Sequence, residues 1–293
     1  MHRQNESMPT PPAAAAGSFA IGGDLAVHRM GFGAMRITGA TGAPNTREAR
    51  QAHAVLHRAT ELGVTLIDTA PLYGVSEDLI GEAFPTYPDG VVIATKVGIT
   101  STPEGLVYRG RPEQIREDCE RSLQRLHLDT IPLSQLHTVD PDVPIEDSVG
   151  ALSDLRREGK VRHVGLSNVD VDQLRQAQSI VPIASVQNRF NLADRESDDI
   201  LDVCSAEGIA FLPWRPLAQQ HISIRGHQAL ERAAARLGAT PSQIALAWVL
   251  GRSPVMCAIP GTSDLAHLEA NIAAAGLSLT QDERLDLDEA AAT

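Results

Sequence analysis

Short apolar segments and amphipathic helical patterns alternate along almost the whole chain, and this alternation most constrains the fold. From residue 30 onward, eight apolar segments are each followed by a helical pattern. The expected strands are 30–35, 64–70, 91–98, 131–137, 161–167, 183–189, 209–214 and 254–260. Strands that alternate with helices form parallel sheets, because each helix carries the chain back to the start of the next strand. Eight such pairs predict an α/β fold of the (β/α)8 (TIM) barrel type.

A doubly wound parallel sheet is the alternative. That fold usually carries a glycine-rich turn, GxGxxG, after its first strand, and no such turn opens the first helix here. Ahead of the first strand, residues 19–28 hold a Gly-Gly-Asp turn between strand-like flanks, which predicts a β-hairpin that closes the floor of the barrel. We expect residues 1–17 to be a disordered tail and residues 18–293 to be a single barrel domain. The sequence leaves open whether Met1 or Met8 is the true start.

The composition argues against several classes of function. The chain of 293 residues has a formal net charge of −12, which disfavours general binding to nucleic acid or to an anionic membrane. No apolar run is long enough to span a bilayer, and the N-terminus does not have the pattern of a signal peptide. Cys119, Cys204 and Cys257 lack the spacing of a metal site, so we expect buried thiols, no metal and a cytoplasmic protein. Because a barrel buries its core within one chain, we also expect a monomer.

Four chemically active side chains fall at or just beyond the ends of three expected strands. They are the carboxylate of Asp68, the phenol of Tyr73, the ammonium of Lys96 and the imidazole of His137. The carboxyl ends of barrel strands meet at one rim, so we expect the four side chains to lie together. A phenol has an ordinary pKa of about 10, and a buried lysine beside it would lower that pKa. An acid poised near the working pH can protonate a carbonyl oxygen, so this set predicts a reduction.

Each of the four residues also has an ordinary structural explanation. Asp68 could cap a turn, Lys96 could be a surface charge, His137 could be a core histidine and Tyr73 could be a packing aromatic. Their occurrence together at successive strand ends favours the catalytic interpretation.

Several longer stretches match one known family. They are GFGAM, LIDTAPLYG, SEDLIGEA, IATKVG, QLH, GKVRHVGLSN, VQNRFN, LPWRPL and IPGTSDLAHLEAN. Through these stretches, residues 18–290 resemble the aldo-keto reductase superfamily. The IPGTS ending is similar to the branch that contains pyridoxal reductases and small aldehyde or ketone reductases. The resemblance implies a (β/α)8 barrel with an N-terminal hairpin, in agreement with the pattern of strands and helices.

The resemblance also implies a role for each active residue. Tyr73 would give a proton to the carbonyl oxygen, and Lys96, paired with Asp68, would lower the pKa of Tyr73. His137 would orient the substrate oxygen, and a reduced nicotinamide in the barrel mouth would supply the hydride. The implied cofactor-binding residues are Gly33, Ala34 and Met35, the carboxamide ligands Ser167, Asn168 and Gln187, the ring platform Trp214, then Arg215 and Leu217, and finally Gly261, Thr262 and Asn271 at the last helix.

Two features depart from the family pattern. Many relatives place a lysine and an arginine around the last helix to grip the 2′-phosphate of NADPH, and this chain has Gly261 and His267 there. The segment after Leu217 lacks the glycine-bearing loop of many relatives. NADPH is therefore the cofactor that the resemblance implies, with NADH left open. Arg215 either supplies a positive charge that compensates for these departures or is simply a solvent-exposed side chain.

Three functions follow from the resemblance. The first is NADPH-dependent reduction of a small-molecule aldehyde or ketone to an alcohol. The second is NAD(P)-dependent oxidation of an alcohol or sugar, since the chemistry is microscopically reversible. The third is a cofactor-sensing regulatory subunit, which the intact set of four active residues disfavours.

The expected lining of the barrel mouth is Met35, Tyr73, Tyr108 and Trp214 on its apolar side, with Arg36 and Arg109 as cations.

Overall fold

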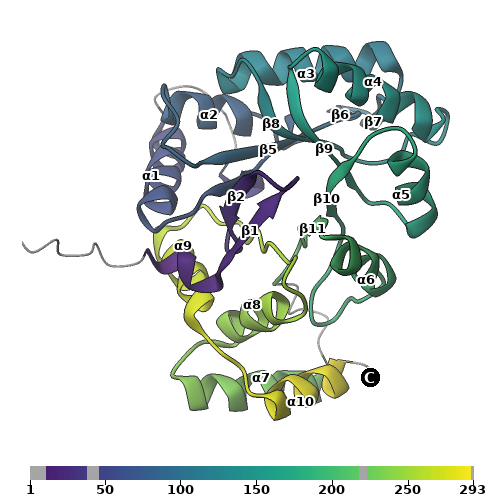
Figure 1. Cartoon of the computed structure of the whole chain (residues 1–293). Coiled ribbons are helices and arrows are strands. Elements are labelled where there is room, and N and C mark those ends of the chain that lie inside the picture. Colours follow the sequence, from purple (N-terminus) through teal and green to yellow (C-terminus); the bar gives the residue numbers. More distant parts are fainter. Residues whose placement is uncertain (1–10, 38–45, 218–222, 292–293) are drawn as a thin grey trace, which may run out of the picture.

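Seven parallel strands form one curled sheet in the computed structural model, which describes residues 11–37, 46–217 and 223–291 (Figure 1). The strands are β3 (Phe32–Gly33), β4 (Leu66–Asp68), β5 (Val92–Val97), β8 (Ile131–Leu136), β9 (Val161–Ser167), β10 (Ile183–Gln187) and β11 (Ala210–Phe211). Their order in the sheet, β3-β4-β5-β8-β9-β10-β11, follows the order along the chain. This arrangement is what repeated strand–helix units produce when consecutive strands pair.

The segment 254–260 closes this sheet into a barrel between β11 and β3. Phe211 pairs with Met256 and Met30 pairs with Ala258, both in the parallel sense. Backbone hydrogen bonds join the segment to both neighbours: Cys257 N–H donates to the Phe211 carbonyl oxygen at 2.8 Å, and Ala258 N–H donates to that of Arg29 at 2.8 Å. The expected eighth strand therefore closes the barrel without forming a regular strand, and the predicted (β/α)8 architecture is confirmed.

Helices follow the strands and lie on the outside of the sheet (Figure 1). They are α1 (Arg47–Glu61), α2 (Ser76–Ala83), α3 (Pro112–Leu126), α4 (Ile145–Arg157), α5 (Val171–Gln178), α6 (Asp198–Glu207), α7 (Ile224–Leu237), α8 (Pro241–Gly251), α9 (Leu265–Ala273) and α10 (Gln281–Ala291). Capping boxes at Asp170 and Thr240 begin α5 and α8. No helix in the described ranges is both long and apolar enough to cross a membrane.

The expected N-terminal hairpin is present. Strands β1 (Ser18–Ile21) and β2 (Leu25–His28) pair in the antiparallel sense. Ile21 and Val27 are buried in the same apolar cluster as Leu133, which belongs to barrel strand β8. The hairpin therefore fills the amino-terminal end of the barrel and seals its floor.

The segment 11–17, which we expected within a disordered tail, forms the short 3-10 helix η1 (Pro12–Ala16). Ala13 is fully buried, and its N–H donates to the carbonyl oxygen of Leu62 at 3.0 Å. A Pro/Ala tract can therefore be ordered when it packs on the barrel wall. Residues 1–10, including the alternative start at Met8, lie outside the described residues, as do residues 38–45 and 218–222.

A second hairpin stands at the carboxyl end of β5. Strands β6 (Ile99–Thr102) and β7 (Gly105–Tyr108) pair in the antiparallel sense. Leu106 is 63% exposed and Tyr108 is 45% exposed. Strand β6 lies against η3 (Pro71–Tyr73), so this hairpin forms one wall beside Tyr73.

The three cysteines are buried and unpaired, as expected. Burial raises the pKa of each thiol to about 12. The cysteines are therefore protonated packing residues at neutral pH.

Candidate active site

The structure brings Asp68, Tyr73, Lys96 and His137 together at the carboxyl rim of the barrel. Lys96 Nζ donates to both carboxylate oxygens of Asp68 at 2.8 Å and to the carbonyl oxygen of Thr69 at 2.9 Å. The same ammonium lies 5.0 Å from the centre of the Tyr73 ring. The rings of Tyr73 and His137 meet edge to face, with their centres 5.9 Å apart. Four groups from three successive strand–helix units thus form one cluster.

Lys96 keeps its charge although it is completely buried. Burial opposes the charge, but attraction to Asp68 and to Tyr73 outweighs it and raises the pKa of Lys96. The ammonium donates to the Asp68 carboxylate and to the Thr69 carbonyl oxygen, and a hydrogen bond with Tyr73 also favours its charged form. Lys96 therefore acts on Tyr73 as a fixed positive charge.

Tyr73 differs from the expectation for its pKa. Burial raises the pKa of the phenol, and Lys96 lowers it by less than burial raises it, so the pKa lies above its ordinary value. Asp68 adds to the rise. Tyr73 is consequently protonated at neutral pH, which leaves its proton available for transfer.

His137 is neutral in this setting. Burial, with a smaller contribution from the positive charge of Lys96, lowers the pKa of His137 to about 3. A neutral imidazole carries a single N–H donor and one acceptor nitrogen. His137 can therefore hydrogen-bond to a substrate oxygen but does not serve as a cationic acid at neutral pH.

Trp214 and Asn168 form a second group beside the cluster. The indole Nε1 of Trp214 donates to Asn168 Oδ1 at 2.9 Å. Asn168 Nδ2 donates to the carbonyl oxygen of His137 at 3.0 Å and to Ser167 Oγ at 3.1 Å. The backbone of Asn168 is left-handed, with φ 55°, a conformation that asparagine adopts more readily than most residues. These bonds fix the ring of Trp214 relative to the strand end that carries His137.

Two cations near the rim have different settings. Arg215 is exposed, has a left-handed backbone with φ 52°, and holds its guanidinium 5.6 Å from the centre of the Trp214 ring. Arg109, considered as a substrate contact, instead forms ion pairs with Glu117 and Asp118 of α3. Arg215 therefore remains a candidate for an anionic ligand, whereas the charge of Arg109 is already matched.

Gly33 and Gly261 have a packing reason to be glycine. A Cβ on Gly33 would lie 2.6 Å from the carbonyl oxygen of Ile259, and a Cβ on Gly261 would lie 2.4 Å from that of Gly33. The absence of both side chains lets the end of β3 and the closing segment touch. Next to Gly33, Ala34 is buried and Met35 is 50% exposed on the 3-10 helix η2 (Ala34–Arg36).

The remaining expected cofactor residues lie at α9 and after β11. Thr262 Oγ1 accepts from the N–H of Asp264, which caps α9. Asn271 is 8% exposed on α9, and its side-chain amide has no hydrogen-bond partner among the described residues. Leu217 is half-buried at the end of the described segment after β11. Asn271 therefore offers a nearly buried amide that a ligand can satisfy.

A profile of the aldo/keto reductase family matches residues 29–292 of the chain. The chain belongs to the aldo/keto reductase family.

Individual relatives align with this aldo/keto reductase over most of its length. It is 44% identical over 280 residues to an uncharacterized oxidoreductase of Schizosaccharomyces pombe, with 94% of this chain and 90% of that protein covered. It is 37% identical over 275 residues to pyridoxine 4-dehydrogenase of Escherichia coli, covering 91% and 96%. The crystal structure of an aldo-keto reductase from Klebsiella pneumoniae in complex with NADPH superposes with a TM-score of 0.79 at 29% identity, covering 93% and 94%. The enzyme class is thus an oxidoreductase that acts on carbonyls or alcohols.

Two buried polar residues of this aldo/keto reductase, Gln135 and Ser185, have no role assigned to them by the sequence motifs. Gln135 Nε2 donates to Ser185 Oγ at 3.0 Å, and Gln135 Oε1 accepts from Gln187 at 3.2 Å. The available signal was a glutamine two residues before His137 in a strand, because residues two apart face the same side of a sheet. Gln135 therefore had to point into the barrel together with His137.

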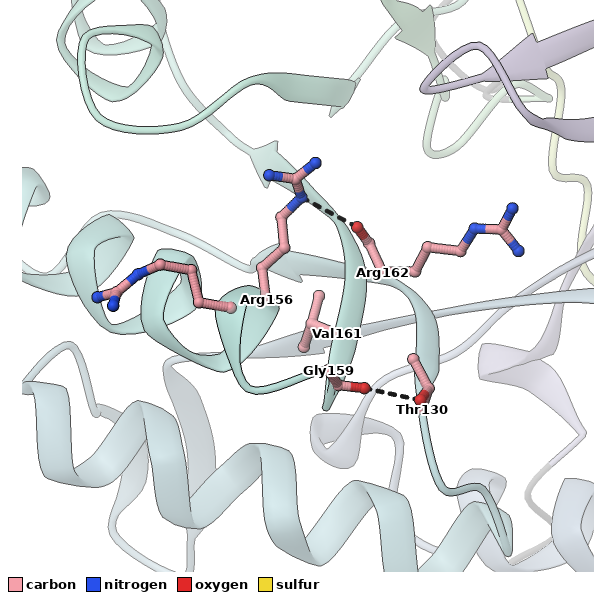
Figure 2. Close-up of a pocket in the computed structure, with 6 residues that line it drawn as sticks. Thr130, Arg156, Gly159, Val161 and Arg162 are labelled. Carbon is pink, nitrogen blue, oxygen red and sulfur yellow. Dashed lines mark hydrogen bonds between the residues drawn. The ribbon is translucent and has the colours of Figure 1, made fainter.

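A surface hollow of about 320 Å³ lies at the amino ends of β8 and β9, at the end of the barrel opposite the rim that carries Tyr73. Figure 2 shows Arg156 and Arg162 beside it, with Arg156 Nε donating to the carbonyl oxygen of Arg162 at 3.1 Å. Thr130 Oγ1 donates to the carbonyl oxygen of Gly159 at 2.7 Å. These bonds tie the turn between α4 and β9 to the start of β8, so we assign the hollow a structural role.

Proposed function

We propose that this aldo/keto reductase uses NADPH to reduce an aldehyde or ketone to an alcohol, with Tyr73 as the proton donor. The supporting observation is the Lys96 ammonium, which both oxygens of Asp68 hold at 2.8 Å and which lies 5.0 Å from the centre of the Tyr73 ring. A protonated phenol beside a fixed cation, at the rim where barrel enzymes place their sites, is suited to give a proton to a carbonyl oxygen.

The residues at the rim fit a nicotinamide dinucleotide. Trp214 offers a flat face, and the Ser167–Asn168 pair offers polar atoms next to it. Asn271 adds a side-chain amide that no described residue satisfies. When bound, the reduced nicotinamide would supply the hydride.

The protein residues would handle the proton. Tyr73 Oη would donate its proton to the oxygen of the carbonyl as negative charge develops there. The resulting phenolate would lie beside Lys96, whose charge is held in place by Asp68. His137, neutral because its pKa is about 3, would hold the substrate oxygen by a hydrogen bond. The same residues would serve alcohol oxidation in reverse.

The substrate would be a small molecule that enters between the β6–β7 hairpin and Trp214. The relative named pyridoxine 4-dehydrogenase makes pyridoxal a first compound to test, alongside activated aldehydes.

We also propose that the enzyme acts as a monomer, because its barrel core is complete within one chain.

Tryptophan fluorescence tests the cofactor assignment, because the chain has two tryptophans in different settings. Trp214 lies at the rim, whereas Trp248 is 1% exposed within α8. We expect NADPH to quench the emission of the wild type and of Trp248→Phe, and to have little effect on that of Trp214→Leu. Tighter binding of NADPH than of NADH would show that other groups replace the missing lysine and arginine. Absence of quenching in the wild type by either dinucleotide would contradict the proposed function.

A further inference from the structure

A chain of hydrogen bonds runs behind Asp68 through the interior of the barrel. Gln187 Nε2 donates to Asp68 Oδ1 at 2.7 Å and to Gln135 Oε1 at 3.2 Å. Gln135 Nε2 then donates to Ser185 Oγ at 3.0 Å. Gln135 and Ser185 are completely buried, and Gln187 is 2% exposed. Gln135, to which the sequence motifs assigned no role, is thus joined to the catalytic cluster through one intermediate side chain.

We infer that Gln135 is a positioning residue, which fixes the amide of Gln187 and, through it, supports the Asp68–Lys96 pair. This inference rests on the proposed function, because it assigns Gln135 a role in the reaction of that site.

The direction of each bond follows from the Asp68 carboxylate. A carboxylate in an ion pair only accepts hydrogen bonds, so Gln187 must turn its NH2 group toward Asp68. The second N–H of that group needs an acceptor, which Gln135 Oε1 provides. Gln135 consequently turns its own NH2 group toward Ser185 Oγ. Gln187 Oε1 is left without a donor among the described residues, and it is the atom available to accept from an amide N–H at the rim.

The strand register explains why Gln135 and Ser185 can meet. Gln135 of β8 and Ser185 of β10 both pair with Gly165 of β9, which lies between them. A Cβ on Gly165 would lie 2.2 Å from Ser185 Oγ and 2.9 Å from Gln135 Cγ. The missing side chain of Gly165 therefore provides the space in which the two polar groups form their bond. On the other side of β8, Lys96 of β5 pairs with Gln135. Gln135 therefore lies between Ser185 and the strand that carries the ion-paired lysine.

Removal of the Gln135 amide has two consequences. Gln187 loses the acceptor that fixes its orientation, so Gln187 Oε1 is no longer held toward the rim for a carboxamide. The Gln187 N–H that donates to Asp68 is also held less firmly, so it offsets less of the negative charge of the carboxylate. Because that negative charge raises the pKa of Tyr73, the pKa should rise further. Loss of one oriented hydrogen bond costs about 0.5–1.5 kcal/mol of binding free energy, which corresponds to about a 2- to 12-fold rise in the dissociation constant.

The test compares Gln135→Met, which keeps the length of the side chain without the amide, with the wild type. We expect the dissociation constant of NADPH, measured by tryptophan fluorescence, to rise about 2- to 12-fold. We also expect the high-pH limb of kcat for aldehyde reduction to move to higher pH. Ser185→Ala, which removes the far end of the chain, should shift both quantities in the same direction and guards against a Gln135→Met protein that does not fold.

Ser134→Ala is the matched control. Ser134 is the neighbour of Gln135 on β8, is equally buried, and its Oγ has no hydrogen-bond partner among the described residues. Unchanged NADPH binding and an unchanged pH profile in Gln135→Met and Ser185→Ala, with an active wild type, would overturn the inference and leave the proposed function standing. Equal changes in Ser134→Ala would also overturn it, because they would indicate a purely structural role. A wild type that neither binds NADPH nor reduces aldehydes would instead refute the proposed function.

Discussion

At the scale of single residues, burial decides which groups around Tyr73 carry charge. Lys96 remains charged because Asp68 lies against it, whereas no carboxylate of the described residues pairs with His137, which is neutral. Tyr73 keeps its proton because its burial raises the pKa more than Lys96 lowers it. The sequence suggested a lowered pKa for Tyr73, since it identifies a neighbouring charge but not the depth of burial.

His137 should make the stability of the protein depend on pH. Its pKa falls from about 6.5 in the unfolded chain to about 3 in the folded one, so the unfolded chain binds a proton first as the pH falls. Stability is therefore present above pH 6.5 and is lost as the pH falls toward 3. We expect the wild type to lose about 2 kcal/mol of unfolding free energy between pH 7.5 and pH 5 that His137→Gln does not lose. Urea unfolding at the two pH values measures this, and equal losses in both proteins would contradict the assignment.

The four residues of the cluster and the pairing of Lys96 with Asp68 could be predicted from the sequence, but the hydrogen bond between Gln135 and Ser185 could not. Asp68, Tyr73, Lys96 and His137 lie in short motifs at strand ends, which the periodicity of the sequence locates. The contact between Gln135 and Ser185 depends on the register of three strands and on the space above Gly165. Register across a barrel is set by packing of the whole sheet, so no local pattern reveals it.

At the scale of elements, helix α10 shows what a local pattern fails to predict. Its sequence is acidic and has a narrow apolar face, with Leu287 1% exposed but Leu285 51% exposed. It is held by Asp288, whose Oδ1 accepts from the Trp248 indole Nε1 at 2.9 Å and lies 3.1 Å from Arg195 Nη2. Helices α5 and α8 were predictable because their caps are local. The position of α10 depends on residues about 40 and 90 positions away, which no local signal provides.

Two aspartates of α10 allow a matched test. Asp288→Ala leaves the buried indole N–H and the guanidinium of Arg195 without their partner, and we expect a loss of about 1–3 kcal/mol in unfolding free energy. Asp286→Ala removes a surface ion pair with Arg232 and should cost less than about 1 kcal/mol. Urea unfolding of both variants measures the difference. A loss from Asp288→Ala no larger than that from Asp286→Ala would show that α10 is not anchored through Trp248.

At the scale of the whole molecule, the barrel gathers residues that are far apart in the chain. Asp68 and Gln187 are 119 positions apart, yet they are hydrogen-bonded at 2.7 Å. The apolar hairpin fills the floor, and buried polar side chains lie at the opposite rim, so the interior has one apolar, sealed end and one polar end. This polarity was predictable, because strand number and strand ends follow from periodicity.

The most direct test of the account is the rate of NADPH-dependent reduction of an activated aldehyde by the wild type, Tyr73→Phe and Tyr87→Phe. Tyr87 is the matched control, because its hydroxyl donates to the Leu126 carbonyl oxygen on the outside of the barrel. We expect Tyr73→Phe to lower kcat by about 10²- to 10⁴-fold while the dissociation constant of NADPH stays within a few-fold, and we expect Tyr87→Phe to keep the wild-type kcat. A Tyr73→Phe enzyme that retained most of the wild-type kcat would contradict the assignment of Tyr73 as the proton donor.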